Sequence, residues 1–188
     1  MLKNPHSLII LVLAVFSFTG CTDGNASNAK SSNDKAIHCQ PSTIREFLKW
    51  YKDHYEPISA IQIVSLAGEE DTARYKVDNT NAAAYTSLLR SSGYFSEQYL
   101  DNQLLYFKER ESIFSRSRQS DGVPVGFEAD LLLFTQEPEA LLEQYKTLSI
   151  EEVDKQQYKL VATDHNLLFD MVEQNGECVV NKISYSKK

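Results

Sequence analysis

The clearest structural signal in this chain of 188 residues lies at 166–185, NLLFDMVEQNGECVVNKISY. Asn175 and Gly176 form a dipeptide typical of two-residue hairpin turns, because both residues tolerate the positive φ angles that such turns require. The apolar and β-branched residues on either side indicate antiparallel strands at 166–174 and 177–185. The end of the chain is therefore predicted to be a β-hairpin.

A two-residue turn fixes the register of this hairpin and places Val172 opposite Val179. Two more strands are predicted directly before the hairpin, at 147–153 and 157–163. Consecutive strands with short connections predict an antiparallel meander.

A helix is predicted from Pro41 to Pro57. Thr43 and Glu46 have the spacing of a capping box, in which the two side chains satisfy backbone N–H groups of the first turn. Because the residue before a proline avoids the helical region, the helix is expected to end near Pro57. Apolar residues recur at helical spacing on one face, namely Ile44, Phe47, Leu48, Tyr51 and Tyr55.

Two short strands are predicted next, at 59–65 and 72–77, with a polar turn between them. Asp78 has a side chain suited to capping a second helix, and Gly93 would end that helix. Ser96 would cap a third, longer helix. These elements place a small hairpin and further helices before the final meander.

The run of apolar residues at 131–134 indicates a fully buried strand over 127–134. Pro138 suits the first position of a short helix that continues to Tyr145. Helices followed by antiparallel strands predict an α+β fold, with N-terminal helices packed on a curved antiparallel sheet.

The amino-terminal segment resembles a bacterial lipoprotein signal, with Lys3, an apolar run at 8–16 and small residues before Cys21. The resemblance implies diacylglycerol on the Cys21 thiol, cleavage after Gly20 and acylation of the new amine. The residue after the cysteine is Thr22 and not Asp, which resembles an outer-membrane rather than an inner-membrane sorting signal. The alternatives are a secretory peptide with an unrelated cysteine, or a transmembrane anchor, although the apolar run is shorter than the ~20 residues that cross a bilayer.

The sequence divides into a signal at 1–20, a small and polar stretch at 21–38 and a single domain at 39–188. The polar stretch holds too little apolar surface to order itself, so it is predicted to be a flexible tether. Cys39 and Cys178 are the remaining cysteines, and a pair in an exported chain favours a disulfide. Two unpaired buried thiols are the alternative.

The chain has a formal net charge of −7 at pH 7. An acidic surface is repelled by phosphate backbones, so nucleic acid is not an expected partner. Membrane contact is expected through the N-terminal lipid alone. The cell envelope is the predicted location.

Three segments, at 47–51 (FLKWY), 92–96 (SGYFS) and 121–137, resemble a family of small bacterial lipoproteins that includes Bacteroidetes members. The architecture of that family is similar to the nuclear transport factor 2-like, cystatin-like roll. The resemblance covers roughly 40–185 and implies a pocket between the helices and the sheet. Such domains often carry a tryptophan on the final strand, whereas this chain has Cys-Val-Val at 178–180.

The sequence contains neither a glycine-rich phosphate loop nor a G-x-S-x-G nucleophile motif, so no catalytic residue is predicted. His38, His54 and His165 lack the spacing of zinc ligands, so neither a metal nor a cofactor is expected.

A candidate pocket can be drawn from aromatic and titratable residues, namely Trp50, Tyr94, Tyr106, Asp130 and His165. The aromatic residues suit a ligand site or a helix–sheet core equally well. Asp130, with Asp121 and Glu137, could include a carboxyl of raised pKa, or these acids could belong to a solvated loop and a helix start. Asp164 and His165 form a general-base pair or a simple turn between strands.

Three functions remain open on this basis. The first is non-catalytic binding of a protein or small ligand by a lipid-tethered domain. The second is an isomerase or hydrolase that uses Asp130 or His165. The third is an immunity or inhibitor protein, whose acidic surface would suit a basic partner.

Overall fold

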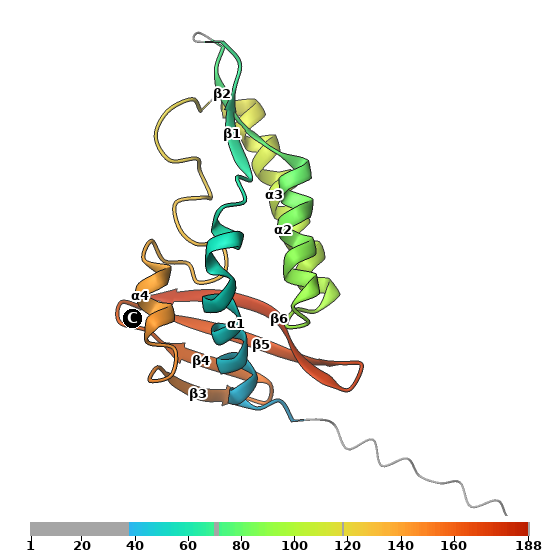
Figure 1. The fold of residues 1–188 in the computed structure, drawn as a ribbon, viewed down its shortest axis with the longest axis vertical. Helices are drawn as coiled ribbons and strands as arrows, with labels where there is room; N and C mark the ends of the chain where they lie inside the picture. Colours follow the sequence, from blue (N-terminus) through green and yellow to red (C-terminus); the bar gives the residue numbers. More distant parts are fainter. Residues whose placement is uncertain (1–37, 70–71, 118, 188) are drawn as a thin grey trace, which may run out of the picture. The chain divides into compact units, whose positions relative to one another are not determined.

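The structure, a computed structural model, describes residues 38–69, 72–117 and 119–187 (Figure 1). These residues belong to one compact unit, Ala36–Lys188. The chain has an α+β fold that combines helices with antiparallel sheets. The predicted signal peptide, Cys21 and nearly all of the predicted tether lie outside the described residues.

The antiparallel meander predicted for the end of the chain is confirmed. It is a four-stranded sheet in the order β3-β4-β5-β6, with each strand antiparallel to its neighbour. The strands are β3 (Ser149–Asp154), β4 (Gln157–Val161), β5 (His165–Gln174) and β6 (Glu177–Lys187).

The hairpin turn between β5 and β6 is also confirmed. Asn175 and Gly176 adopt φ angles of 57° and 85°, and Val172 pairs with Val179. Positive φ at both turn residues matches the right-handed twist of the strands, which explains why this dipeptide predicts the turn so well.

The first helix, α1 (Pro41–Ser59), begins at Pro41 as predicted, but its cap differs from the prediction and it continues past Pro57. Gln40 is the N-cap and makes no side-chain cap bond, so the predicted Thr43–Glu46 capping box is wrong. Thr43 lies inside the first turn, because the helix begins at a proline whose fixed φ already suits that position. At the other end the helix continues through Pro57, where tertiary packing that buries Ile58 outweighs the local preference of the chain.

A small hairpin follows, formed by β1 (Val64–Ala67) and β2 (Arg74–Val77). The predicted start of the first strand at Ser59 is wrong, because that residue still belongs to α1. In Figure 1 this hairpin lies at the end of α1 that points away from the four-stranded sheet.

The predicted caps of the next two helices are confirmed. Asp78 Oδ1 accepts hydrogen bonds from the backbone N–H groups of Thr80 (2.8 Å) and Asn81 (3.0 Å) at the start of α2, Asn79–Ser91. Ser96 Oγ accepts from Tyr99 N at 3.0 Å at the start of α3, Glu97–Ser117. Each bond satisfies a backbone donor that lacks a partner within the helix.

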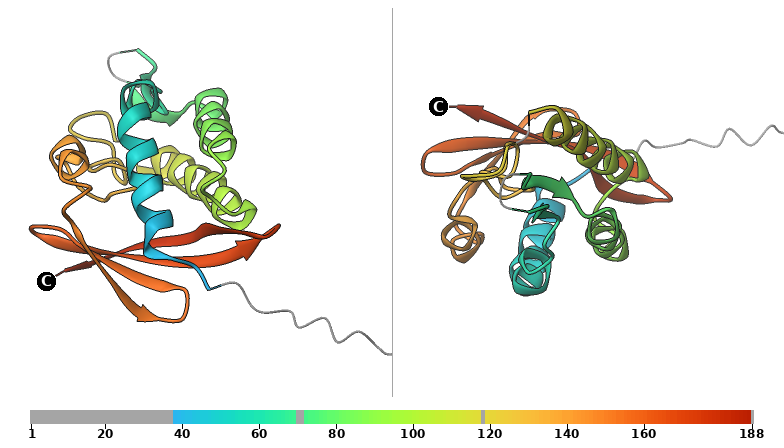
Figure 2. Two further views of the ribbon diagram at one scale, coloured as in Figure 1. Left: turned by 60° about the horizontal axis from the view of Figure 1, so that its bottom comes forward. Right: turned by 90° about the horizontal axis from the view of Figure 1, so that it is seen from above.

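The described helices lie on one face of the four-stranded sheet (Figure 2). The core forms where the apolar face of α1 meets the inward side chains of the sheet. Alternate residues of β4 and β5 point to this core, as the two-residue period of a strand requires. The fully buried side chains include Phe47, Leu48, Leu160, Leu167 and Phe169.

Cys39 and Cys178 lie at disulfide-bonding distance, with sulfur atoms 2.16 Å apart and Cα atoms 5.5 Å apart. Cys39 immediately precedes α1 and Cys178 lies in β6, so the bond joins the start of the domain to its last strand. The Tyr158 hydroxyl donates to the Cys39 carbonyl and ties the same point to β4.

The predicted strand over 127–134 is wrong, because these residues form a series of turns. Asp130 Oδ1 accepts from the backbone N–H groups of Leu132 (2.9 Å) and Leu133 (2.7 Å), and Phe134 has a φ of 52°. Leu132 and Leu133 are both fully buried. Successive residues of a strand point to opposite faces, so turns bury this adjacent pair in one core more readily than a strand does.

We call residues 128–136 the partition loop. The predicted helix after it is confirmed as α4 (Pro138–Glu143), with the proline in its first turn.

Candidate functional site

Three surface hollows surround the partition loop, and Glu128 and Ala129 line all three. The α4 hollow, about 670 Å³, lies between the loop, α4 and the sheet. The α1 hollow, about 620 Å³, lies between the loop, α1, α2 and β1. The α3 hollow, about 410 Å³, lies between the loop and α3. The partition loop is therefore the common wall of the three hollows.

The α1 hollow combines apolar walls with a small number of polar groups, as ligand sites usually do. Its polar side chains include three tyrosines, from α1 and α2, together with Glu128 and Asp130 from the partition loop. Among the described residues that line it, none is Lys, Arg or His. The apolar wall includes Ile58, Ile61, Ile63, Val64, Phe127 and Leu131.

Asp130 is held by three hydrogen bonds. Its Oδ2 atom accepts from the Tyr51 hydroxyl at 2.5 Å, and its Oδ1 atom accepts from the backbone of Leu132 and Leu133. Burial raises the pKa of Asp130, and these hydrogen bonds oppose the shift because they stabilise the charged form. The carboxyl thus fixes the bend of the partition loop and ties it to α1.

Tyr85 supplies an unusual polar group to the α1 hollow. Its side chain is only 3% exposed, yet its hydroxyl has no hydrogen-bond partner within the described residues. Burial, with further contributions from Tyr99 and Asp130, raises the pKa of Tyr85 well above its usual value. A buried hydroxyl without a partner is costly, so this group marks a place where a ligand could supply the missing bond.

Tyr51 and Tyr55 form one corner of the same hollow. They lie one turn apart on α1, with ring centroids 5.7 Å apart and ring planes at 80°. Burial and the nearby carboxylates of Glu139 and Asp130 raise the pKa of Tyr55 to about 12, so its hydroxyl is neutral at pH 7. Burial and the same Asp130 carboxylate also raise the pKa of Tyr51.

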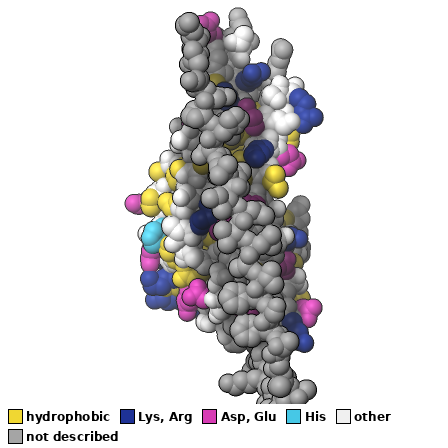
Figure 3. Space-filling view, turned by 90° about the vertical axis from the view of Figure 1, so that its right-hand side faces the viewer, with side chains coloured by type: hydrophobic (Ala, Val, Ile, Leu, Met, Phe, Trp, Pro, Cys, Tyr) yellow, Lys and Arg dark blue, Asp and Glu magenta, His cyan; other side chains and the backbone are white. Residues whose placement is uncertain are grey.

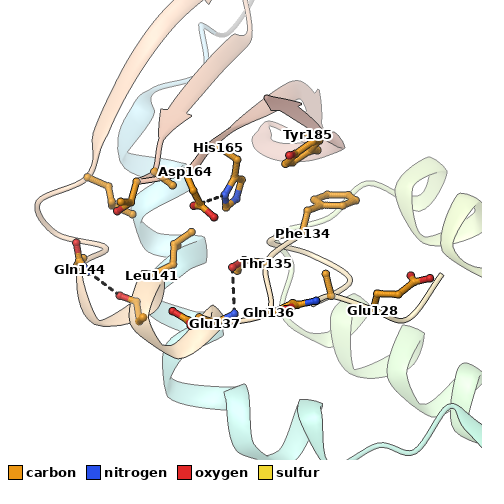
Figure 4. A pocket seen from close by; sticks show the side chains of 15 residues that line it. Glu128, Phe134, Thr135, Gln136, Glu137, Leu141, Gln144, Asp164, His165 and Tyr185 are labelled. Carbon is orange, nitrogen blue, oxygen red and sulfur yellow. Dashed lines mark hydrogen bonds and ion pairs between the residues drawn. The ribbon is translucent and has the colours of Figure 1, made fainter. Parts of the chain in front are cut away.

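His165 lines the α4 hollow, and Figure 4 shows its ring joined to Asp164 on one side. Nδ1 lies 2.9 Å from Asp164 Oδ1, and Nε2 lies 3.1 Å from the Leu133 carbonyl oxygen. The ring also packs against Tyr185 at 5.6 Å between centroids. A general base needs a ring nitrogen that can reach the substrate, and here both nitrogens face protein acceptors.

The structure does not bring the five residues of the predicted pocket together. Asp130 lines the α1 and α3 hollows, His165 lines the α4 hollow and Tyr106 lines the α3 hollow. Trp50 and Tyr94 line none of the three. Their rings instead contact one another, with centroids 5.9 Å apart, and pack against the edge of the hydrophobic core.

Tyr106 has a structural role beside the α3 hollow. Its hydroxyl donates to the Gly126 carbonyl, and the Arg110 guanidinium lies 5.0 Å from its ring centroid. Of the other two acids considered from the sequence, Glu137 lines the α4 hollow and Asp121 lies exposed in the loop after α3.

The sequence pattern places Tyr51 and Tyr55 together on the apolar face of the first helix and does not single out Tyr85 or Glu128 as lining residues. The spacing of Tyr51 and Tyr55 does place both on one face of α1. Nothing local indicates that Asp130, 79 residues further along, closes the hollow beside them.

Among residues 38–69, 72–117 and 119–187, no group of three or more His, Cys, Asp or Glu side chains is arranged to hold a metal ion. Within the same ranges, no helix has the length and apolarity that crossing a membrane requires.

On the face shown in Figure 3, described Lys and Arg side chains are scattered among Asp and Glu side chains.

Compared with known proteins, the chain matches no family model, no curated protein sequence and no solved structure.

Proposed function

We propose that this chain is a lipid-anchored domain of the cell envelope that binds a small ligand in the α1 hollow without transforming it. The observation that carries the proposal is the buried Tyr85 hydroxyl, which lacks a partner and lines an apolar hollow of about 620 Å³. A hollow of this volume falls in the range that accommodates small organic molecules.

Binding is favoured over catalysis by the engagement of the titratable groups. Asp130 accepts three hydrogen bonds that hold the partition loop, and both ring nitrogens of His165 face protein acceptors. Asp130 and His165 also line different hollows. An enzyme would need at least one of these groups within hydrogen-bond reach of a substrate proton.

The proposed anchor rests on the lipobox resemblance that ends at Cys21, which lies outside the described residues. Two or more acyl chains hold a protein durably at a membrane, whereas one chain does so only marginally. The proposed tether over 21–38 would let the domain at 39–188 move away from the bilayer surface. We assign the outer membrane as the location on the same resemblance.

We also propose that the domain is a cystatin-like roll of the nuclear transport factor 2 type and belongs to the family of small bacterial lipoproteins that it resembles. Supporting features are the four-stranded antiparallel meander and the helices on one of its faces.

A ligand-retention experiment tests the binding function. The full-length protein, purified without denaturation, should carry a small molecule that mass spectrometry detects after release. The variant Val64→Trp, which places a large side chain in the wall of the α1 hollow, should lose that molecule. Val153→Trp, on the exposed side of β3, is the matched control. Equal retention by both variants would contradict the proposed site.

Replacing the lipidated residue tests the anchor separately. Cys21→Ser should abolish metabolic labelling with palmitate and move the protein out of the membrane fraction. Unchanged processing and complete retention with membranes would contradict the proposed anchor.

A further inference from the structure

We propose that the α1 hollow selects a ligand that is both apolar and positively charged, such as an organic amine with an aromatic or aliphatic body. This inference rests on the proposed binding function and specifies the chemistry of its ligand.

The charged side chains that line the hollow among the described residues are all acidic. Glu128 and Asp130 line it, and Glu139 on α4 lies close enough to Tyr55 to influence its phenol. No Lys, Arg or His occurs among the described lining residues. Glu128 is exposed, and although its Oε2 atom accepts from the Gly126 backbone N–H at 2.8 Å, the carboxylate has further acceptor positions for an incoming cation. An anionic ligand would meet like charge from the side chains that line the hollow.

The charged groups that line the hollow accept hydrogen bonds and do not donate them. The Tyr51 hydroxyl already donates to Asp130, so its proton is committed. The Glu128 and Asp130 carboxylates are acceptors, and Asp130 already accepts three hydrogen bonds. The Tyr85 hydroxyl, which can accept as well as donate, is buried without a partner in the described part of the chain. An ammonium group carries three donors and no acceptor, which matches this set better than a carboxylate or phosphate does.

Aromatic side chains in the α1 hollow also favour a positively charged ligand. Tyr51, Tyr55, Tyr85 and Phe127 all line the hollow, and the rings of Tyr51 and Tyr55 stand nearly perpendicular. Aromatic faces attract cations through the ring quadrupole, and the attraction grows when water is excluded. The acids alone would not define a site, but the unpartnered Tyr85 hydroxyl and the aromatic walls point to the same class of ligand.

A matched series of probes separates charge from apolar contact. The full-length protein would be titrated with 4-phenylbutylamine, 4-phenylbutan-1-ol and 4-phenylbutyrate, and binding followed by chemical-shift changes of labelled tyrosines. We expect the amine to bind about tenfold more tightly than the carboxylate, with the alcohol between them. Raising the salt concentration should weaken binding of the amine more than binding of the alcohol.

Single substitutions test whether the preference for the amine arises in the α1 hollow. Glu128→Gln should lower the affinity for the amine and leave the affinity for the alcohol unchanged. Glu143→Gln is the matched control, because it removes an exposed carboxylate on α4 that lines none of the three hollows. Tyr85→Phe should weaken amine binding without lowering the melting temperature, because it removes a hydroxyl that makes no bond in the described structure.

The outcomes distinguish this inference from the function on which it rests. Equal affinities for amine and carboxylate, or an equal loss of amine binding in Glu128→Gln and Glu143→Gln, would overturn the charge selectivity and leave the binding function standing. Failure of all three probes to bind would overturn the inference and count against the proposed function as well.

Discussion

The hydroxyl of Tyr51 donates a 2.5 Å hydrogen bond to Oδ2 of Asp130 and so joins α1 to the partition loop. The other oxygen of the same carboxyl accepts two backbone N–H groups of that loop. One side chain therefore sets both the bend of the loop and its distance from α1. The shape of the α1 hollow depends on this pair.

Replacing Asp130 should show how much of the fold this carboxyl holds. Asp130→Ala removes three hydrogen bonds worth about 0.5–1.5 kcal/mol each, so we expect the free energy of unfolding to fall by about 2–4 kcal/mol. Asp130→Asn should cost about 1 kcal/mol or less, because the amide oxygen still accepts from the loop. Urea unfolding measures both, with Asp121→Ala as the control at an exposed acid. Equal losses in the Ala and Asn variants would contradict this account.

The free energy of unfolding should depend on pH through the titration of Asp130. Burial raises the pKa of Asp130 above its ordinary 3.8, so the folded state binds the proton more tightly than the unfolded state does. Its contribution to the free energy of unfolding is therefore fully present below pH 3.8, and it decreases as the pH rises through the pKa that Asp130 has in the folded protein. The difference in unfolding free energy between wild type and Asp130→Asn should decrease from pH 4 towards pH 7. A difference that grows over this range would mean that the hydrogen bonds to the carboxylate outweigh its burial.

We expect the hydrogen bonds of His165 to stabilise the conformation of the partition loop. Its ring connects Asp164 to the Leu133 carbonyl, so His165→Ala is expected to lower the free energy of unfolding by about 2 kcal/mol. Hydrogen exchange should accelerate at residues 132–135, as measured by mass spectrometry of the matching peptide. His54→Ala, at an exposed position on α1, should change neither quantity. Unchanged exchange at the loop would show that the buried leucines hold it without the histidine.

Reduction should weaken the domain substantially. The Cys39–Cys178 bond closes a loop with a sequence separation of 139, for which the chain-entropy model gives about 4–5 kcal/mol. The double variant Cys39→Ser, Cys178→Ser should therefore melt well below the wild type in non-reducing buffer. Adding a reductant should lower the melting temperature of the wild type and leave that of the variant unchanged. If the reductant has no effect on the wild type, the two thiols are not bonded in solution.

Features encoded within a few residues could be predicted from the sequence. Asn175 and Gly176 carry the conformational preference of their turn, and Asp78 and Ser96 cap helices whose first donors lie two or three residues away. Each depends on contacts close in the chain, so the pattern contains the information needed.

The partition loop could not be predicted in this way. Its apolar run resembles a strand, but its conformation depends on Asp130 meeting Tyr51 and on Leu133 meeting His165. These contacts join distant parts of the chain. The continuation of α1 through Pro57 has the same cause, since the burial of Ile58 decides it.

The link between Cys39 and Cys178 also determines how the domain would respond to mechanical tension. A force pulling on the two ends of the chain would pass from residue 38 directly into β6 through the sulfur atoms. The helices, the partition loop and most of the sheet lie inside the covalent ring and would carry none of that load along their backbone. In the oxidised domain such a load would fall on β6 after Cys178, whereas in the reduced chain it would also be carried by α1 and the rest of the backbone between the two cysteines.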